Sequence, residues 1–132
     1  MKKLRVALCQ INPTVGDING NTERIIREIK TQERWAPDII VFPELAITGY
    51  PPEDLLNKPG FIDDNIRATH EIASSVGSFI VILGFVDRED SLLYNAAAVI
   101  YKGSMVDIYH KIHLPNYGVF DEMRYFHPGV KC

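Results

Sequence analysis

The sequence predicts one α/β domain with a mixed β-sheet and helices packed on a face of that sheet. Short apolar runs and amphipathic helical patterns follow one another in the order β-α-β-α-β-β-β. The chain has 132 residues, 46% of them apolar and 23% charged, which is the size and composition of one ordinary globular domain. Buried strands joined through helices favour parallel pairing, and the short turns between the last strands favour hairpins.

The first strand is expected over residues 4–11, where most positions on both faces are apolar, as in a strand buried on both sides. After a loop marked by Pro and Gly, a helix is expected to begin between Asn19 and Thr22, because these positions offer side chains that cap helices. The apolar stripe of this helix consists of Ile25, Ile26 and Ile29. Residues 36–38, Ala-Pro-Asp, end the helix.

The second half of the fold follows from the same patterns. Residues 39–42 read as a second buried strand, and a Gly/Pro-punctuated loop over residues 45–60 is long enough to suggest a functional loop. A helix is expected over residues 61–76. The last three strands are expected at 79–86, 93–101 and 105–109, joined by a polar turn at 87–91 and a hairpin turn at Lys102-Gly103.

Composition and charge exclude several classes of protein. The 14 basic and 17 acidic residues give a net charge of −3 and are well mixed, so no basic stripe predicts nucleic acid or an anionic membrane surface as partner. The longest apolar run, residues 79–86, is too short to span a bilayer, and no signal peptide is recognisable, so the expected location is the cytoplasm. The two cysteines, Cys9 and Cys132, form neither a disulfide framework nor a zinc spacing.

The first cluster of candidate functional residues follows the second predicted strand. Glu44 comes directly after the buried run 39–42, and the carboxyl ends of strands are where ligands bind in open α/β sheets. A carboxylate at that position suits a general base. The alternative is a solvated loop residue or a helix cap, and spacing alone leaves that alternative open.

The second cluster lies after the last predicted strand. Lys111 precedes a loop rich in Pro and Gly, and an ammonium fixed near a carboxylate can stabilise a developing oxyanion. Alone, an ordinary surface lysine is the simpler interpretation. His110, His113 and His127 are expected to be hydrogen-bonded loop residues, and no metal site is expected, because His-x-x-His without nearby Cys or acidic ligands is a weak pattern.

Two long motifs carry a resemblance to a known family. Residues 42–45, Phe-Pro-Glu-Leu, with residues 48–55, Thr-Gly-Tyr-Pro-Pro-Glu-Asp-Leu, resemble the first catalytic motif of the nitrilase, or carbon–nitrogen hydrolase, superfamily. Residues 109–111, Tyr-His-Lys, with residues 114–122, Leu-Pro-Asn-Tyr-Gly-Val-Phe-Asp-Glu, resemble its second motif. The strings after Glu44 and Lys111 are closest to the glutaminase domain of glutamine-dependent NAD synthetases. The similarity covers essentially the whole chain.

The resemblance implies a nitrilase-type α-β-β-α sandwich, here incomplete, and a Glu-Lys-Cys triad. Glu44 matches the general base and Lys111 the lysine that stabilises the tetrahedral intermediate. Tyr117 falls where this branch binds glutamine, and Tyr50 and Glu122 fall near the same pocket. The implied reaction is hydrolysis of the amide of L-glutamine through a thioester, with the ammonia passed to a synthetase domain that makes NAD from deamido-NAD. No cofactor is implied for this chain, whereas ATP and magnesium are expected in the synthetase domain, and homo-oligomers are common in the superfamily.

The nucleophile departs from this pattern. In the family it lies at the end of a further apolar strand, and the chain ends before that strand, so residues 1–132 are expected to be the N-terminal portion of one glutaminase domain. Cys132 comes too soon after Pro128-Gly129 to match, and Cys9 is expected to pack inside the first strand. The chain alone is therefore expected to be inactive. Two alternatives stay open, a stand-alone nitrilase-type amidase and a non-catalytic short subunit that pairs with a partner.

Overall fold

A computed structural model describes residues 2–130 and confirms the element order β-α-β-α-β-β-β. Two 3₁₀ turns lie in the loops that follow the second and the last strand. The elements are β1 (Val6–Leu8), α1 (Ile18–Glu33), β2 (Ile39–Val41), η1 (Glu53–Asn57), α2 (Pro59–Ser74), β3 (Ile80–Glu89), β4 (Leu92–Tyr101), β5 (Ser104–His110) and η2 (Glu122–Arg124). Cys132 lies outside the described residues, as do Met1 and Lys131.

The five strands form one mixed sheet in the order β1-β2-β3-β4-β5. The first three strands are parallel, since α1 and α2 carry the chain back between them, and β3, β4 and β5 are antiparallel hairpin neighbours. The turn between β4 and β5 consists of Lys102 and Gly103, with φ of 47° and 81°, the left-handed pair that a tight hairpin needs. The mixed sheet and the hairpin expected from the sequence are confirmed.

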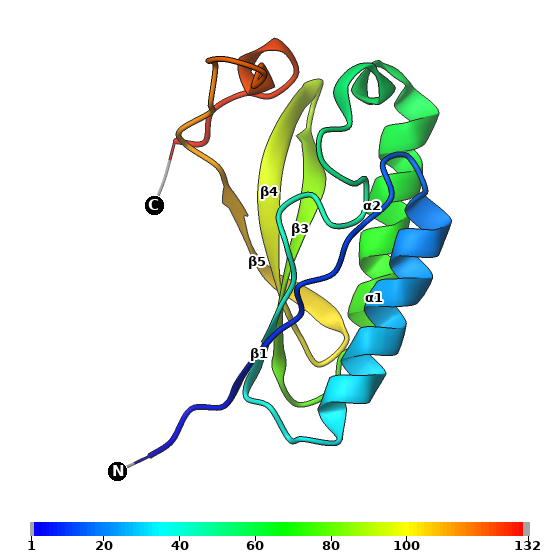
Figure 1. The fold of residues 1–132 in the computed structure, drawn as a ribbon, viewed down its shortest axis with the longest axis vertical. Coiled ribbons are helices and arrows are strands. Elements are labelled where there is room, and N and C mark those ends of the chain that lie inside the picture. Colours follow the sequence, from blue (N-terminus) through cyan, green and yellow to red (C-terminus); the bar gives the residue numbers. More distant parts are fainter. Residues whose placement is uncertain (1, 131–132) are drawn as a thin grey trace.

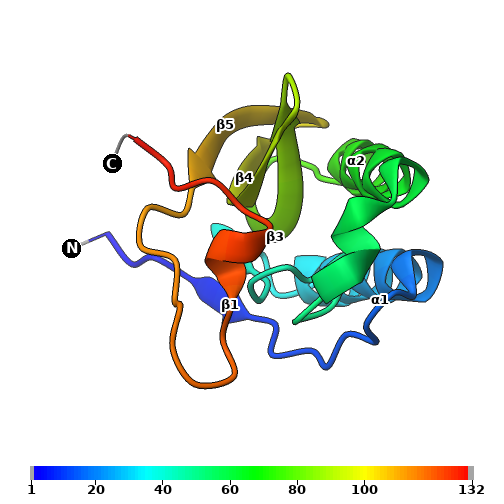
Figure 2. The same ribbon diagram turned by 90° about the horizontal axis from the view of Figure 1, so that it is seen from above.

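Both helices lie on the same face of the sheet (Figures 1 and 2). The residues that point to this face are fully buried in the central strands, including Ile40, Val81 and Ile100, which are register neighbours on β2, β3 and β4. Ile25 and Ile29 of α1 are fully buried against them, as the apolar stripe predicts. The core therefore lies between the sheet and the two helices, and its packing fixes the positions of the strands.

Neither α-helix of residues 2–130 covers the opposite face of the sheet (Figure 2). A lateral row on this open face runs through Leu8, Val41, Ile82 and Val99, which are register neighbours across four strands. Leu8 is 77% exposed and Val6 is 44% exposed. The expectation that the first strand is buried on both faces is wrong for this reason: β1 is an edge strand, and only its helix-side positions are covered.

Strand β1 is shorter than the expected residues 4–11, and α2 begins and ends two residues before the expected 61–76. Two further boundaries differ for a reason that the contacts show. Helix α1 begins at Ile18, earlier than the expected start at Asn19 to Thr22, because Asp17 is the cap and accepts a hydrogen bond from the Gly20 N–H at 3.0 Å. The expected polar turn at 87–91 is also too long. Strand β3 continues through Asp87 to Glu89, because its partner β4 extends to Leu92 and pairs with these polar positions at the end of the sheet.

The chain crosses the sheet closely after β2. The backbone of residues 43–45 passes directly over Gly84 of β3, and the Ala46 N–H donates to the Gly84 carbonyl at 2.9 Å. A Cβ at Gly84 would lie 2.4 Å from the Pro43 carbonyl oxygen, so only glycine permits this approach. None of the helices within residues 2–130 is long and apolar enough to cross a membrane.

Candidate active site

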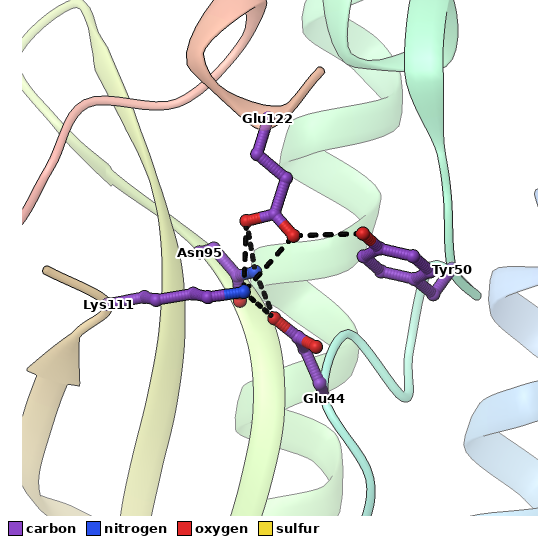
Figure 3. A network of polar contacts seen from close by, with 5 residues as sticks. All are labelled: Glu44, Tyr50, Asn95, Lys111 and Glu122. Atoms are coloured by element: carbon purple, nitrogen blue, oxygen red, sulfur yellow. Dashed lines mark hydrogen bonds and ion pairs between the residues drawn. The ribbon is translucent and has the colours of Figure 1, made fainter. Parts of the chain in front are cut away.

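Glu44 stands at the carboxyl end of β2, where the sequence places it. The close crossing over Gly84 holds the backbone around it, and the neighbouring Leu45 is fully buried with a φ of 46°. The Glu44 side chain itself is 45% exposed and projects over the open face of the sheet (Figure 3). The backbone at Glu44 is thus held in place, while its carboxylate is partly accessible to solvent.

Lys111 reaches the same point from the end of β5. Its backbone is fixed on both sides, since its N–H donates to the Asn95 carbonyl at 2.8 Å and its carbonyl accepts from the Gly129 N–H at 2.9 Å. The ammonium Nζ lies 2.6 Å from Glu44 Oε1 and contacts both carboxylate oxygens of Glu122, at 3.1 and 3.2 Å (Figure 3). The structure therefore brings together the two residues that the motifs single out, which are 67 positions apart in the chain.

Two opposing effects act on the pKa of Lys111. Partial burial lowers it, whereas the hydrogen bonds to Glu44 and Glu122 and the attraction of the two carboxylates raise it, and the net effect is a raised pKa. Lys111 is consequently held as an ammonium at neutral pH. A fixed positive charge at this position can stabilise negative charge that develops on a substrate oxygen.

Glu122 is the buried carboxylate of the site, only 6% exposed, and it comes from the 3₁₀ turn η2. Its Oε1 accepts from Lys111 and from the hydroxyl of Tyr50, the latter at 2.9 Å (Figure 3). Burial, the hydrogen bond to Glu122 and the negative charge nearby raise the pKa of Tyr50, so this phenol stays a donor. Tyr50 and Glu122, expected near the pocket, are thus part of the same polar network.

Asn95 completes this network, although its residue pattern was not among those that predict the site. It lies on β4, is 3% exposed, and its Nδ2 donates to Glu44 Oε1 at 2.6 Å and to Glu122 Oε2 at 3.2 Å (Figure 3). The signal was present in the strand pattern: on a strand where Leu93, Ala97 and Val99 share its face, Asn95 is the polar exception. A polar side chain in the middle of an apolar strand has to find partners when buried.

Tyr117 lies at the rim of the site. Its side chain is 70% exposed, and its ring packs edge-on against Phe120, with the centroids 5.6 Å apart. Phe120 in turn lies 6.5 Å from the ring of Tyr50. Tyr117 is therefore near the network through an aromatic row, but it makes no hydrogen bond to the network within residues 2–130.

Two hollows adjoin the network. One, of about 250 Å³, is lined by Glu44, Asn95, Lys111 and neighbours on β3 and β4. The other, of about 390 Å³, lies between the loop after Tyr50 and the loop that carries Glu122. A small polar ligand entering either hollow would meet charged groups at its wall.

The histidines take positions outside this network. His110 points to the helix-side face, where its Nε2 lies 2.7 Å from Asp87 Oδ2 and its ring stacks on Tyr94 at 4.0 Å between centroids. His110 is hydrogen-bonded, as expected, but it is the last residue of strand β5 and not a loop residue. Its ligand atom lies within 4.8 Å of those of Asp87 and Glu89, a group that could hold a cation and that the sequence pattern did not indicate.

Comparison with known proteins identifies the family of this chain. The sequence model of the family described as carbon-nitrogen hydrolase matches residues 5–131. The chain belongs to the carbon-nitrogen hydrolase family. The resemblance drawn from the two motifs is thereby confirmed.

Several relatives narrow the similarity to one branch of this family. The chain is 46% identical to the glutamine-dependent NAD(+) synthetase of Thermotoga maritima over 131 residues, which are 98% of the chain and 23% of the relative. It is 44% identical to that of Xanthomonas campestris, covering 93% of the chain and 22% of the relative. The chain therefore spans about a quarter of the length of the curated relatives it matches.

Solved structures confirm the fold class. A glutamine-dependent NAD+ synthetase from Acinetobacter baumannii superposes with a TM-score of 0.92 at 41% identity, over 99% of this chain and 25% of that one. An amidase from Nesterenkonia superposes with a TM-score of 0.79 at 21% identity, over 97% of this chain and 49% of that one, which shows a shared fold. The mixed sheet with its two helices is thus part of a nitrilase-type fold.

Proposed function

We propose that this chain contributes the base and the lysine of a glutaminase site, which releases ammonia from L-glutamine for the ATP-dependent synthesis of NAD from deamido-NAD in a longer protein. The observation that carries the proposal is the ion pair of Lys111 Nζ with Glu44 Oε1 at 2.6 Å on the open sheet face. The similarity to glutamine-dependent NAD synthetases supports this choice of substrate and product. ATP and magnesium would act in the synthetase part, and the assembly would be a homo-oligomer.

The proposed reaction is acyl transfer in two steps. A cysteine thiol gives its proton to Glu44 and its sulfur attacks the side-chain amide carbon of glutamine, and Lys111 stabilises the oxyanion. The carbon–nitrogen bond then breaks, and Glu44 returns the proton to the departing ammonia. Water, which gives a proton to the same carboxylate, attacks the thioester; the carbon–sulfur bond breaks, glutamate leaves, and Glu44 returns the proton to the cysteine sulfur. Glu122 holds the Lys111 ammonium in place through two contacts.

We assign substrate contact to the residues around the hollows. Tyr117, whose ring is exposed at the rim, would pack on the bound glutamine, as the resemblance implies. Tyr50 and Glu122 line the larger hollow and would form its polar wall. Their mutual hydrogen bond fixes the orientation of that wall before the substrate arrives.

The nucleophile would be a cysteine of the longer protein, because Cys132, which lies outside the described residues, comes too soon after Pro128-Gly129 to match the family pattern. Cys9 is 8% exposed in the core between sheet and helices, and burial, with a contribution from Glu28, raises the pKa of its thiol. A buried thiol with a raised pKa is a poor nucleophile. We therefore propose that the 132-residue chain alone does not hydrolyse glutamine.

A chimeric enzyme tests the proposed function directly. Residues 5–131 replace the homologous stretch of the Thermotoga maritima synthetase, and NAD formation is measured with glutamine and, separately, with ammonium as the nitrogen source. The chimera should use both. Glu44→Gln and Lys111→Met should abolish use of glutamine and leave use of ammonium intact. Equal loss with both nitrogen sources, or no loss with glutamine, would contradict the assignment.

The isolated chain supplies the complementary measurement. Ammonia release from glutamine by the purified chain should equal the rate without protein. Release that Glu44→Gln abolishes would show that the chain has its own nucleophile, and would overturn the proposal of an inactive part. Release from other amides but not from glutamine would favour a general amidase.

A further inference from the structure

We infer that Asn95 is a positioning residue that decides which oxygen of Glu44 acts as the base. Glu44 Oε1 accepts two hydrogen bonds, from Asn95 Nδ2 and from Lys111 Nζ, both at 2.6 Å (Figure 3). No hydrogen bond from residues 2–130 reaches the other oxygen, Oε2. With Oε1 occupied, Oε2 is the oxygen free to take a proton from a reacting group.

Lys111 alone would not fix the carboxylate in this way. An ammonium on a flexible stem acts as a mobile point charge, and it is shared here among three carboxylate oxygens. Asn95, by contrast, is 3% exposed and sits on β4 between two paired neighbours, so its amide has little freedom. Its backbone carbonyl also accepts the Lys111 N–H, so one residue aligns both partners of the ion pair.

The amide suits this place because it donates without adding charge. The network holds two carboxylates, Glu44 and Glu122, and one ammonium, that of Lys111. A second cation beside Glu44 would weaken it as a base, and a third carboxylate would repel both. The two protons of Asn95 Nδ2 are instead divided, one to each carboxylate, which holds the two at a fixed separation around Lys111.

This inference rests on the proposed function for its catalytic meaning, but the geometry can be tested without any activity. In the ¹⁵N-labelled chain, the two Nδ2 protons of Asn95 should be well separated in shift and slow to exchange with water. Glu44→Gln should move one of them, and Glu122→Gln the other. The side-chain amides of Asn21 and Asn65 are buried internal references, since they donate to backbone carbonyls, and should not respond.

Two results would overturn the inference in this experiment. One is that, in the unmodified chain, the side-chain amide protons of Asn95 exchange with water as fast as those of an exposed asparagine. This measurement does not require any variant to fold. The other is an Asn95 signal that neither glutamine variant moves. Neither result depends on whether the chain acts on glutamine.

Kinetics in the chimeric enzyme separate positioning from a purely structural role. Asn95→Leu keeps the branched shape of the side chain, with two methyl groups in place of the amide, and removes both N–H donors. It should lower kcat with glutamine by about 10- to 100-fold with KM within about threefold, since the base is misplaced while binding persists. Asn19→Leu, the same change at an exposed position of α1, should alter neither constant. An Asn95→Leu enzyme with unchanged kcat, or one that loses use of ammonium equally, would contradict the role.

Discussion

Gly84→Ala should show how far the candidate site depends on one close backbone crossing. A Cβ at Gly84 would lie 2.4 Å from the Pro43 carbonyl oxygen, 2.5 Å from the Leu45 nitrogen and 2.7 Å from Glu44 Cα. Ordinary contact needs 3.4 Å or more, so the stretch around Glu44 has to retreat by about 1 Å. The neighbouring atoms are backbone and cannot rotate aside.

The cost follows from what this retreat disrupts. It stretches the hydrogen bond from the Ala46 N–H to the Gly84 carbonyl, worth about 1 kcal/mol, and it strains the packing of the fully buried Leu45, at about 1–3 kcal/mol. Alanine regains about 0.5–1 kcal/mol because it is less flexible than glycine in the unfolded chain. The free energy of unfolding should therefore fall by about 2 kcal/mol.

Urea unfolding followed by circular dichroism measures this change. Gly60→Ala is the matched control, because a Cβ there meets no atom within 4 Å, and it should be up to about 1 kcal/mol more stable than the unmodified chain. NMR titration of the Lys111 ammonium gives a second readout: as Glu44 retreats, the raised pKa of Lys111 should fall towards its ordinary value. If Gly84→Ala is as stable as Gly60→Ala and the pKa of Lys111 is unchanged, the crossing does not position Glu44.

Three further outcomes follow from the structure. The pKa values of Tyr50 and Lys111 are raised in the fold above ordinary values of 10.0 and 10.5, so the stability that these groups contribute is complete below about pH 10 and is lost as the pH rises further. Urea unfolding at about pH 8–11.5 should show this loss of stability, and Tyr50→Phe or Lys111→Met should make the loss smaller. A free energy of unfolding that does not change over this pH range would contradict the network. The thiol of Cys9, studied with Cys132→Ser, should react with a disulfide reagent at least about 100-fold more slowly in the fold than in urea, and equal rates would show that β1 is open. Asp17→Ala should lower the free energy of unfolding by about 1 kcal/mol through loss of the α1 cap, whereas Asp17→Asn should cost less; equal losses would locate the effect in charge instead.

Local patterns were sufficient to predict the two α-helices and the five strands of this fold, but not its two 3₁₀ turns. The stripe of Ile25 and Ile29 and the apolar runs of β2, β3 and β4 predict the helix and the strands, because burial acts on each element with its own period. The exposure of Val6 and Leu8 was missed, since the apolarity of a strand says nothing about which of its faces is covered. The end of β3 was missed because polar residues pair as well as apolar ones when a partner strand extends beside them.

The sequence by itself determined the element order, the family and the identity of Glu44 and Lys111 as the residues to examine. Long motifs carry this information, because the residue types that a reaction needs recur at fixed positions along the chain. Only the tertiary structure decided that Lys111 lies between Glu44 and Glu122, that Tyr50 donates to Glu122, and that Asn95 joins both carboxylates. These contacts join residues from β4, the end of β5 and two loops, and their distances depend on register and on the crossing at Gly84, which no local pattern encodes.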